Sequence, residues 1–328
     1  MNYRRCPVLG VHYTQSFSDD PDARRCETER RANNVKNLAA EQLTSNDVID
    51  LYNQDYVLHH IDGARLFDRE NRRFFLRPAP QYVLERHGPR VGQTVLDLGC
   101  GGGELVPYLA AAGATVFALD FSNDAVEIAQ SLIKKFPVSL QERVCVDRGD
   151  VKSLPYPDRF FDKVYSLDVL EHINDDELRE MLREVGRVLK RDGRLIFTTP
   201  NVRKQSVIEE QKRRIQEPEH FTDRMHIGLR TSAQLRRMIE EEGFGVRFRY
   251  CPTLYIARQT NREGVVSRAL FAAYSFLGQR LGLSWFGGDQ VGICWDRRRG
   301  RHFLGSEVVG DRVQFADTVV RWLLRRTR

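Results

Sequence analysis

The stretch of residues 95–120, VLDLGCGGGELVPYLAAAGATVFALD, constrains the fold more than any other part of the chain. It holds four glycines in five positions, between a short apolar run and an alanine-rich run. A strand that enters a glycine-rich turn and then a helix brings bare backbone N–H groups up to a ligand that a Cβ atom would push away. The stretch therefore predicts a strand, a ligand-binding turn and a helix in succession.

From Thr94 onward, short apolar runs alternate with longer amphipathic segments, which is typical of βαβ units and a parallel sheet. Two helical segments begin with capping-box pairs, Asn174 with Glu177 and Thr231 with Gln234. The expected strands are 94–98, 115–119, 144–146, 163–167, 195–198, 246–250 and 291–295. The fold class is therefore predicted to be α/β.

Further segments surround this α/β part. Residues 1–44 are expected to be poorly ordered, because they carry too few apolar groups to offset the entropy of ordering. Apolar residues at helical spacing in 45–93 predict a lead-in of two helices that could act as a lid. The main domain is expected at 94–296, with insertions at 202–230 and 252–290. The second insertion is either a helix packed on the core or on a second subunit, or one wall of an apolar pocket.

Residues 297–328 form a basic C-terminal tail. Residues 296–328 hold nine arginines against four acids, which is +5 of the formal net charge of +6. A broad nucleic-acid surface is therefore not expected. The end of the tail, FADTVVRWLLRRTR, predicts a basic amphipathic helix. This helix either packs on the protein's own surface or makes a peripheral contact with an anionic membrane.

Cysteine usage and the N-terminus bear on the compartment. The six cysteines show no metal-ligand spacing and are too sparse for a disulfide scaffold. The first residues carry charge but no apolar run of the kind found in a signal peptide. We expect a cytoplasmic protein, either soluble or peripheral to a membrane.

The spacing of the glycines distinguishes two classes of ligand. The nicotinamide pattern G-x-G-x-x-G fits Gly99 and Gly101 but places Glu104 third, where an acid would repel a pyrophosphate. The pattern D-x-G-x-G-x-G is filled by Asp97, Gly99, Gly101 and Gly103. It resembles motif I of the class I S-adenosylmethionine-dependent methyltransferases, whose cofactor carries a cationic sulfonium.

Later segments extend this resemblance over about residues 90–250. They are Asp120 after the second strand, Gly149-Asp150-Val151 after the third, the run LPYPDRFFDKVYSLDVLEHI, and the turn LKRDGRL. DLGCGGG, GATV and the Leu-Glu-His turn are most similar to the ubiquinone-biosynthesis O-methyltransferase type. The resemblance implies a Rossmann-like, seven-stranded, mostly parallel sheet with helices on both faces. The cofactor residues that it implies are Asp97, Gly99, Gly101, Gly103, Asp120, Phe121, Asp150, Val151, Leu167 and Asp168.

Each of these acids also has a purely structural interpretation. Asp97 could bond its own glycine loop, Asp120 could be an ordinary carboxylate at a strand end, and Asp150 could form a turn.

Methyl transfer itself requires no nucleophilic residue, since placing the acceptor atom on the S–CH3 axis supplies most of the rate gain. A hydroxyl acceptor benefits from a base, and His172 lies where ligands bind in open α/β sheets. His226, in the first insertion, is the second candidate base. We expect no metal. Glu219, His220, Asp223 and His226 lie close in sequence, but their spacing matches no ligand motif.

These features favour methyl transfer from S-adenosylmethionine to a small, apolar-bodied molecule, with oxygen favoured as the acceptor atom and nitrogen and carbon left open. Two alternatives remain open: an RNA methyltransferase or nucleic-acid-associated module, and a cofactor-binding protein without turnover. The sequence does not indicate an oligomeric state.

Overall fold

The computed structural model describes residues 78–202, 225–251 and 290–297, together with the backbone of four short strands at 2–5, 12–15, 67–68 and 73–74. The tail after residue 297, most of both insertions and most of the region before residue 78 lie outside the described residues, including the predicted amphipathic helix and Glu219, His220 and Asp223.

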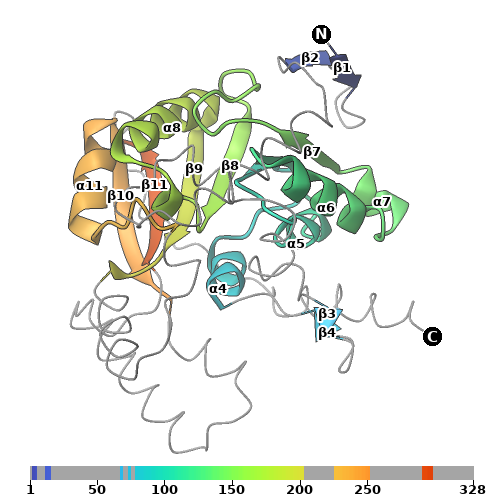
Figure 1. Ribbon diagram of the computed structural model, residues 1–328, viewed down its shortest axis with the longest axis horizontal. Helices are drawn as coiled ribbons and strands as arrows, with labels where there is room; N and C mark the ends of the chain where they lie inside the picture. The colour runs from blue at the N-terminus through green and yellow to red at the C-terminus, as the bar shows by residue number, and fades with distance from the viewer. Residues whose placement is uncertain are drawn as a thin grey trace, which may run out of the picture.

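A seven-stranded mixed sheet forms the centre of the molecule (Figure 1). Its strand order is β10-β11-β9-β8-β5-β6-β7, and only β11 pairs antiparallel with its neighbours. The strands are β5 (Thr94–Leu98), β6 (Thr115–Asp120), β7 (Val144–Arg148), β8 (Phe161–Leu167), β9 (Leu189–Thr199), β10 (Phe244–Tyr250) and β11 (Gln290–Asp296). All seven predicted strands are confirmed, and each is as long as or longer than predicted.

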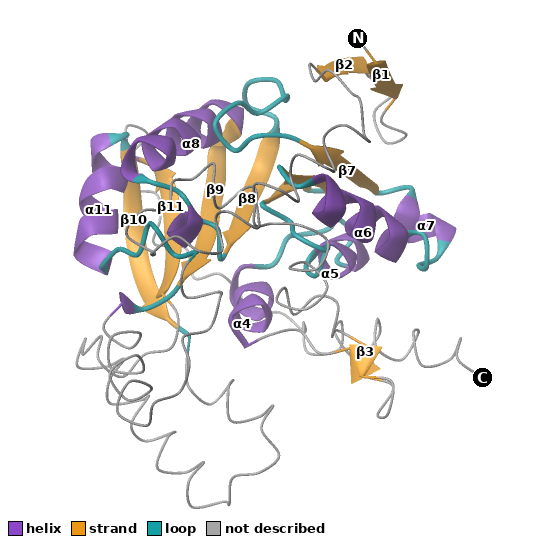
Figure 2. Cartoon of the chain, viewed as in Figure 1, coloured by secondary structure: helices purple, strands orange, loops and turns teal. Residues whose placement is uncertain are grey.

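Helices cover both faces of this sheet (Figure 2). They are α4 (Pro78–His87), α5 (Val106–Ala111), α6 (Asn123–Ile133), α7 (Val138–Gln141), α8 (Asp175–Val188) and α11 (Ser232–Glu241). Both predicted capping boxes are formed, at the start of α8 and of α11. Every helix in the described ranges is too short or too polar to span a lipid bilayer.

Most residues of the central strands β5, β6 and β8 are buried, because alternate residues enter different cores. Leu96 and Leu98 of β5 pack with α8 and α11, whereas Val95 packs with α4 and α5 on the other face. Such two-sided burial is characteristic of parallel strands. It fixes the register of the sheet and therefore the positions of the residues at the strand ends.

Little of the N-terminal region is described. Within residues 1–44 the structure shows one pair of antiparallel strands, β1 (Asn2–Arg5) and β2 (His12–Gln15). Within the lead-in it shows a second pair, β3 (Phe67–Asp68) and β4 (Arg73–Phe74), and one helix, α4, among the described residues, so the prediction of two helices there stays a prediction. Such pairs are joined by backbone groups and need no apolar periodicity. The helix starts at Pro78, a position that proline favours, and proline restrains the residue before it from helical geometry.

Candidate active site

The strand order places the candidate ligand site between β5 and β8. The chain proceeds from β5 through β6 to β7 in one direction, and the strands β8 and β9 lie on the other side of β5. At such a reversal of strand order, the loops after two adjacent strands diverge and leave a crevice at the carboxyl ends. Asp97 and Gly99 lie at the end of β5, and Leu167 and Asp168 at the end of β8.

The glycine turn after β5 depends on the absence of side chains. Gly99, Gly101 and Gly103 have φ angles of 76°, 51° and 83°, a region that favours glycine. A Cβ atom on Gly99 would come within 2.3 Å of Cγ2 of Val169, in the turn after β8. The glycines therefore allow the two turns that border the crevice to approach each other.

Four N–H groups of this turn donate within the protein, including that of Gly103, which donates to the carbonyl of Cys100 at 2.9 Å. The amides of Gly99 and Cys100 donate to the carbonyl of Leu119, and that of Gly101 donates to Oδ2 of Asp120 at 2.8 Å. The acid that bonds the glycine loop is therefore Asp120, and not Asp97. Asp120 also accepts from the amide of Ser122 at 3.0 Å, so it joins the turns after β5 and β6.

Three acids are buried together at this end of the sheet: Asp97, Glu104 and Asp120 are 3%, 7% and 5% exposed. Oδ2 of Asp97 is buried without a hydrogen-bond partner. Burial, reinforced by the charges of Asp120 and Glu104, raises the pKa of Asp97 to about 8. Burial also raises the pKa of Asp120, and the donated backbone hydrogen bonds oppose that shift. Such a cluster favours a cationic ligand.

Phe121, Asp150 and Val151, which the resemblance also implies for the cofactor, are nearer the surface. The carboxylate of Asp150 is 44% exposed, accepts from the amide of Lys152, and lies 3.6 Å from Nζ of the same lysine. Val151 packs partly against the core on the α8 side. The carbonyl of Phe121 accepts from Nε of Arg148 at 2.9 Å. The turn-forming interpretation of Asp150 is thus realised in the structure, and its exposed carboxylate remains accessible to a ligand.

The turn after β8 is held against β9. Asp168 has a φ of 57°, unusual for a residue other than glycine, and its Oδ1 accepts from Oγ1 of Thr198 at 2.7 Å. The one-turn helix η3 (Leu170–His172) follows, and the buried carboxylate of Glu171 accepts from Oγ1 of Thr199 at 3.1 Å. Strand β9 thereby holds the carboxylates of Asp168 and Glu171 in place through Thr198 and Thr199.

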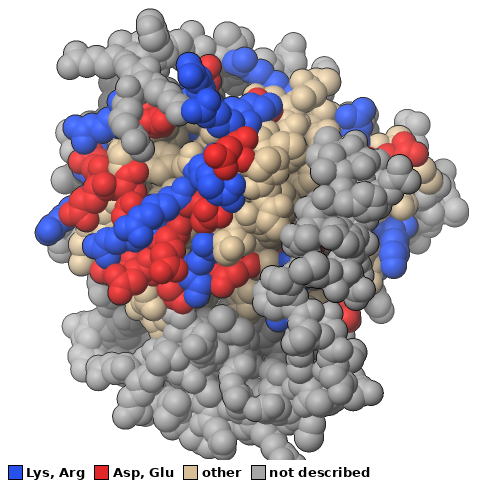
Figure 3. Space-filling view, turned by 90° about the horizontal axis from the view of Figure 1, so that it is seen from above, with Lys and Arg blue, Asp and Glu red and all other residues tan. Residues whose placement is uncertain are grey.

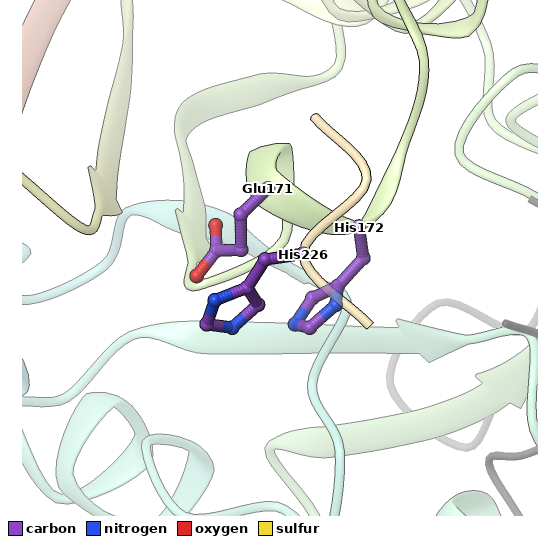
Figure 4. A group of neighbouring side chains, drawn as sticks. All are labelled: Glu171, His172 and His226. Atoms are coloured by element: carbon purple, nitrogen blue, oxygen red, sulfur yellow. The ribbon is translucent and has the colours of Figure 1, made fainter. Parts of the chain in front are cut away.

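His172 and His226, which are 54 positions apart in the sequence, lie side by side (Figure 4). Their ring centroids are 5.0 Å apart, and the Glu171 carboxylate points to the same side of the turn. Nδ1 of His172 lies 3.0 Å from the carbonyl of Met225. Because a carbonyl only accepts, Nδ1 carries the proton and the Nε2 lone pair is the proton acceptor of this ring. Burial, together with His226, lowers the pKa of His172 to about 4.

Among the described residues, Glu171, His172 and His226 could together hold a cation, because their donor atoms all lie within 4.8 Å of one another. One carboxylate with two imidazoles is a donor set that zinc uses in proteins. No residue spacing in the sequence indicates this group, because His226 reaches it from another loop. Glu104, Thr199 and Arg230 are further polar residues that sequence reasoning did not place in the site.

Comparisons with known proteins agree with this geometry. The family model described as "Methyltransferase domain" matches residues 96–197. A methyltransferase named GfsG, from Streptomyces halstedii, is 34% identical over 124 residues, which are 38% of this chain and 43% of the relative. The ubiquinone biosynthesis O-methyltransferase of Proteus mirabilis is 31% identical over 159 residues, or 48% of this chain and 56% of the relative. The chain thus spans about half the length of these curated relatives.

A solved structure, that of the [4+2]-cyclase SpnF, superposes with a TM-score of 0.50 at 22% identity, covering 77% of this chain and 97% of that one. This likeness supports the fold alone.

The cofactor of the family fits the residues present. S-adenosylmethionine carries positive charge, and the buried carboxylate of Asp97, with an oxygen that has no partner, is a group that a cation would satisfy. The glycine spacing, the strand order and the matched family model all apply to the same segment. Residues 96–197 therefore match a methyltransferase domain, and the strand order and glycine spacing of this segment are like those of the class I S-adenosylmethionine-dependent methyltransferases.

Proposed function

We propose that this protein transfers a methyl group from S-adenosylmethionine to an oxygen atom of a small, apolar-bodied acceptor, with His172 as the general base. The observation that carries the proposal is the placement of a buried acid cluster and a neutral imidazole at the two turns that border one crevice. When bound, S-adenosylmethionine would supply a methyl group already activated by a cationic sulfur.

The three acids provide negative charge for the cation. Asp97 holds its proton below about pH 8 when no cation is near, and it would release the proton as a positive charge approaches. Asp120 keeps the glycine turn in place through Gly101 while its carboxylate remains available to ribose hydroxyls.

His172 would take the proton from the acceptor hydroxyl at Nε2. Its Nδ1 proton is committed to the carbonyl of Met225, so the ring stays in one tautomer and orientation. Its lowered pKa keeps it neutral at physiological pH. His226 borders the same space and is the second candidate for this role.

A small acceptor is favoured over a nucleic acid by the charges of the visible surface. Among the described residues of the face in Figure 3, basic and acidic side chains lie next to one another, and no large patch of one sign stands out among them. On α8 and α11 they pair with each other, as in Arg183 with Glu242 and Arg237 with Glu241. The O-methyltransferase relative is consistent with an oxygen acceptor.

The test is methyl transfer to two matched acceptors that share one apolar aromatic ring, a phenol and the corresponding aniline. We expect S-adenosylhomocysteine to accumulate with the phenol, and NMR of the product to show a methyl ether. Faster methylation of the aniline would refute the oxygen preference. Binding of S-adenosylhomocysteine without turnover of either acceptor would favour a protein that binds cofactor only, and retention of RNA with a steep salt dependence would favour a nucleic-acid substrate.

A further inference from the structure

Arg230 lies beneath the turn that carries Glu171 and His172, and it is only 5% exposed. Its guanidinium donates to the carbonyl of Leu170 at 2.7 Å, to that of Ile173 at 2.8 Å and to that of Gly228 at 2.8 Å. Nε also donates to Oδ1 of Asp175 at 2.7 Å, at the start of α8. A planar guanidinium can address several acceptors at fixed angles in this way, whereas an ammonium group cannot.

The acceptors of these bonds are specific to the candidate site. Leu170 and Ile173 flank Glu171 and His172, and Gly228 is two residues from His226. Two further bonds join the same loop to the same turn. The amide of Gly228 donates to the carbonyl of Glu171 at 2.8 Å, and Nδ1 of His172 donates to the carbonyl of Met225.

The loop that carries Arg230 is also attached to the sheet. Nε2 of Gln290, a buried residue at the start of β11, donates to the carbonyls of Pro200 and of Arg230. The backbone of Arg230 is therefore fixed to the end of β9 and the start of β11, while its side chain extends to the turn after β8.

We propose that Arg230 is a positioning residue that sets the distance and orientation of His172 relative to His226 for the proton transfer. This inference rests on the proposed function. The hydrogen bonds that the structure shows for Arg230 go to the β8 turn, to the loop of His226, to the start of α8 and to Gln290, and none goes to Asp97, Asp120 or the glycine turn. Its loss should therefore impair catalysis and leave cofactor binding intact.

Gly228 offers an independent way to disturb the same contact. A Cβ atom at this position would come within 2.1 Å of the carbonyl oxygen of Ile173 and 2.8 Å of a guanidinium nitrogen of Arg230. Gly228→Ala should therefore separate the loop from the turn while the arginine is retained. The two substitutions act on one contact, so their effects on kcat should be less than multiplicative in the double variant.

The experiment compares Arg230→Lys, Gly228→Ala and the double variant with the parent. The matched control is Arg183→Lys, in which an exposed arginine on α8 loses its two bonds to Glu242. Three quantities are measured: the affinity for S-adenosylhomocysteine by calorimetry, kcat and KM for the phenol acceptor, and the tautomer and hydrogen bonding of His172 by NMR of the ring nitrogens.

For Arg230→Lys and Gly228→Ala we expect kcat to fall about tenfold or more with cofactor affinity within about twofold of the parent. The ring-nitrogen signals of His172 should show that Nδ1 no longer donates to the carbonyl of Met225, because the loop has moved away from the turn. The control should change none of the three.

Several results would overturn the inference. One is an unchanged kcat together with an unchanged hydrogen bond from Nδ1 of His172 to the carbonyl of Met225 in Arg230→Lys. Another is a joint loss of activity and cofactor binding in both single variants, which would make Arg230 a general folding residue. The NMR and calorimetry need no methyl acceptor. If no acceptor is methylated but this hydrogen bond of His172 is lost as expected, the proposed function fails and the positioning role of Arg230 stands.

Discussion

Replacing Asp97 by asparagine should stabilise the protein without cofactor and weaken its binding of cofactor. The carboxyl group of Asp97 is 3% exposed, and burial raises its pKa from 3.8 to about 8. The folded state therefore binds this proton more tightly than the unfolded state does. A raised pKa of this sign means that stability is lost as the pH rises from about 4 to about 8.

The magnitude follows from the pKa shift. Each pH unit inside this window costs the parent up to about 1.4 kcal/mol, so the interval from pH 5 to pH 7 costs up to about 2.7 kcal/mol. Asparagine does not titrate and lacks this loss. The stability difference between Asp97→Asn and the parent should therefore grow by about 2 kcal/mol in favour of the variant over that interval.

The assay is urea unfolding of both proteins at pH 5 and pH 7 without cofactor, followed by calorimetry with S-adenosylmethionine. The variant should lose roughly 1.5–3 kcal/mol of binding free energy, the range for a hydrogen bond to a charged group. Asp192→Asn, on an exposed part of β9, is the control and should change neither quantity. A stability difference that is the same at both pH values, together with unchanged cofactor affinity, would refute the assignment of Asp97 to a cation.

Further predictions concern the base, metal dependence and the tail. His172→Ala should lower kcat for an oxygen acceptor by about a hundredfold with little change in cofactor affinity. The parent's kcat should be constant from pH 5.5 to 8, because His172 is neutral above about pH 4. A fall of kcat below about pH 6.5 that persists in the variant would exclude His172 as the general base. Treatment with a chelator should leave activity unchanged, since methyl displacement needs no Lewis acid, and a loss that an added divalent cation restores would assign Glu171, His172 and His226 to a metal. The full chain, but not a chain ending at Gly310, should co-sediment with anionic vesicles in preference to neutral ones. If both chains bind the vesicles equally, or neither binds, the tail would instead pack on the protein's own surface.

Much of the sheet could be predicted because its strands are buried on both faces. Runs such as Thr94–Leu98 and Thr115–Asp120 are mostly apolar with one acid near the end of each, and their length and neighbouring glycines distinguish them from helices. Capping residues made the starts of α8 and α11 predictable for a local reason: Asn174 and Thr231 bond the backbone three residues on. The short strand pairs before residue 78 have no such signal.

The candidate site was predictable only where its chemistry is local in the sequence. The D-x-G-x-G-x-G spacing located the turn after β5, but the structure shows that Asp120, 19 positions from Gly101, is the acid that bonds it. His172 and Met225 are 53 positions apart, and Arg230 bonds a carbonyl 60 positions away. Contacts of this kind depend on where residues 225–230 lie relative to the turn after β8. Neither the periodicity of apolar residues nor the spacing of the motifs in the sequence indicates that position.

The central claim is that the crevice at the ends of β5 and β8 binds a cationic nucleoside and not a dinucleotide. Calorimetry with S-adenosylmethionine, S-adenosylhomocysteine and NADH, on the parent and on Asp120→Ala, tests it most directly. We predict that both sulfur nucleosides bind the parent, that NADH does not, and that Asp120→Ala weakens S-adenosylhomocysteine by roughly 1.5–3 kcal/mol, because ribose hydroxyls lose a charged acceptor. Tighter binding of NADH than of either nucleoside, with Asp120→Ala binding like the parent, would contradict the account.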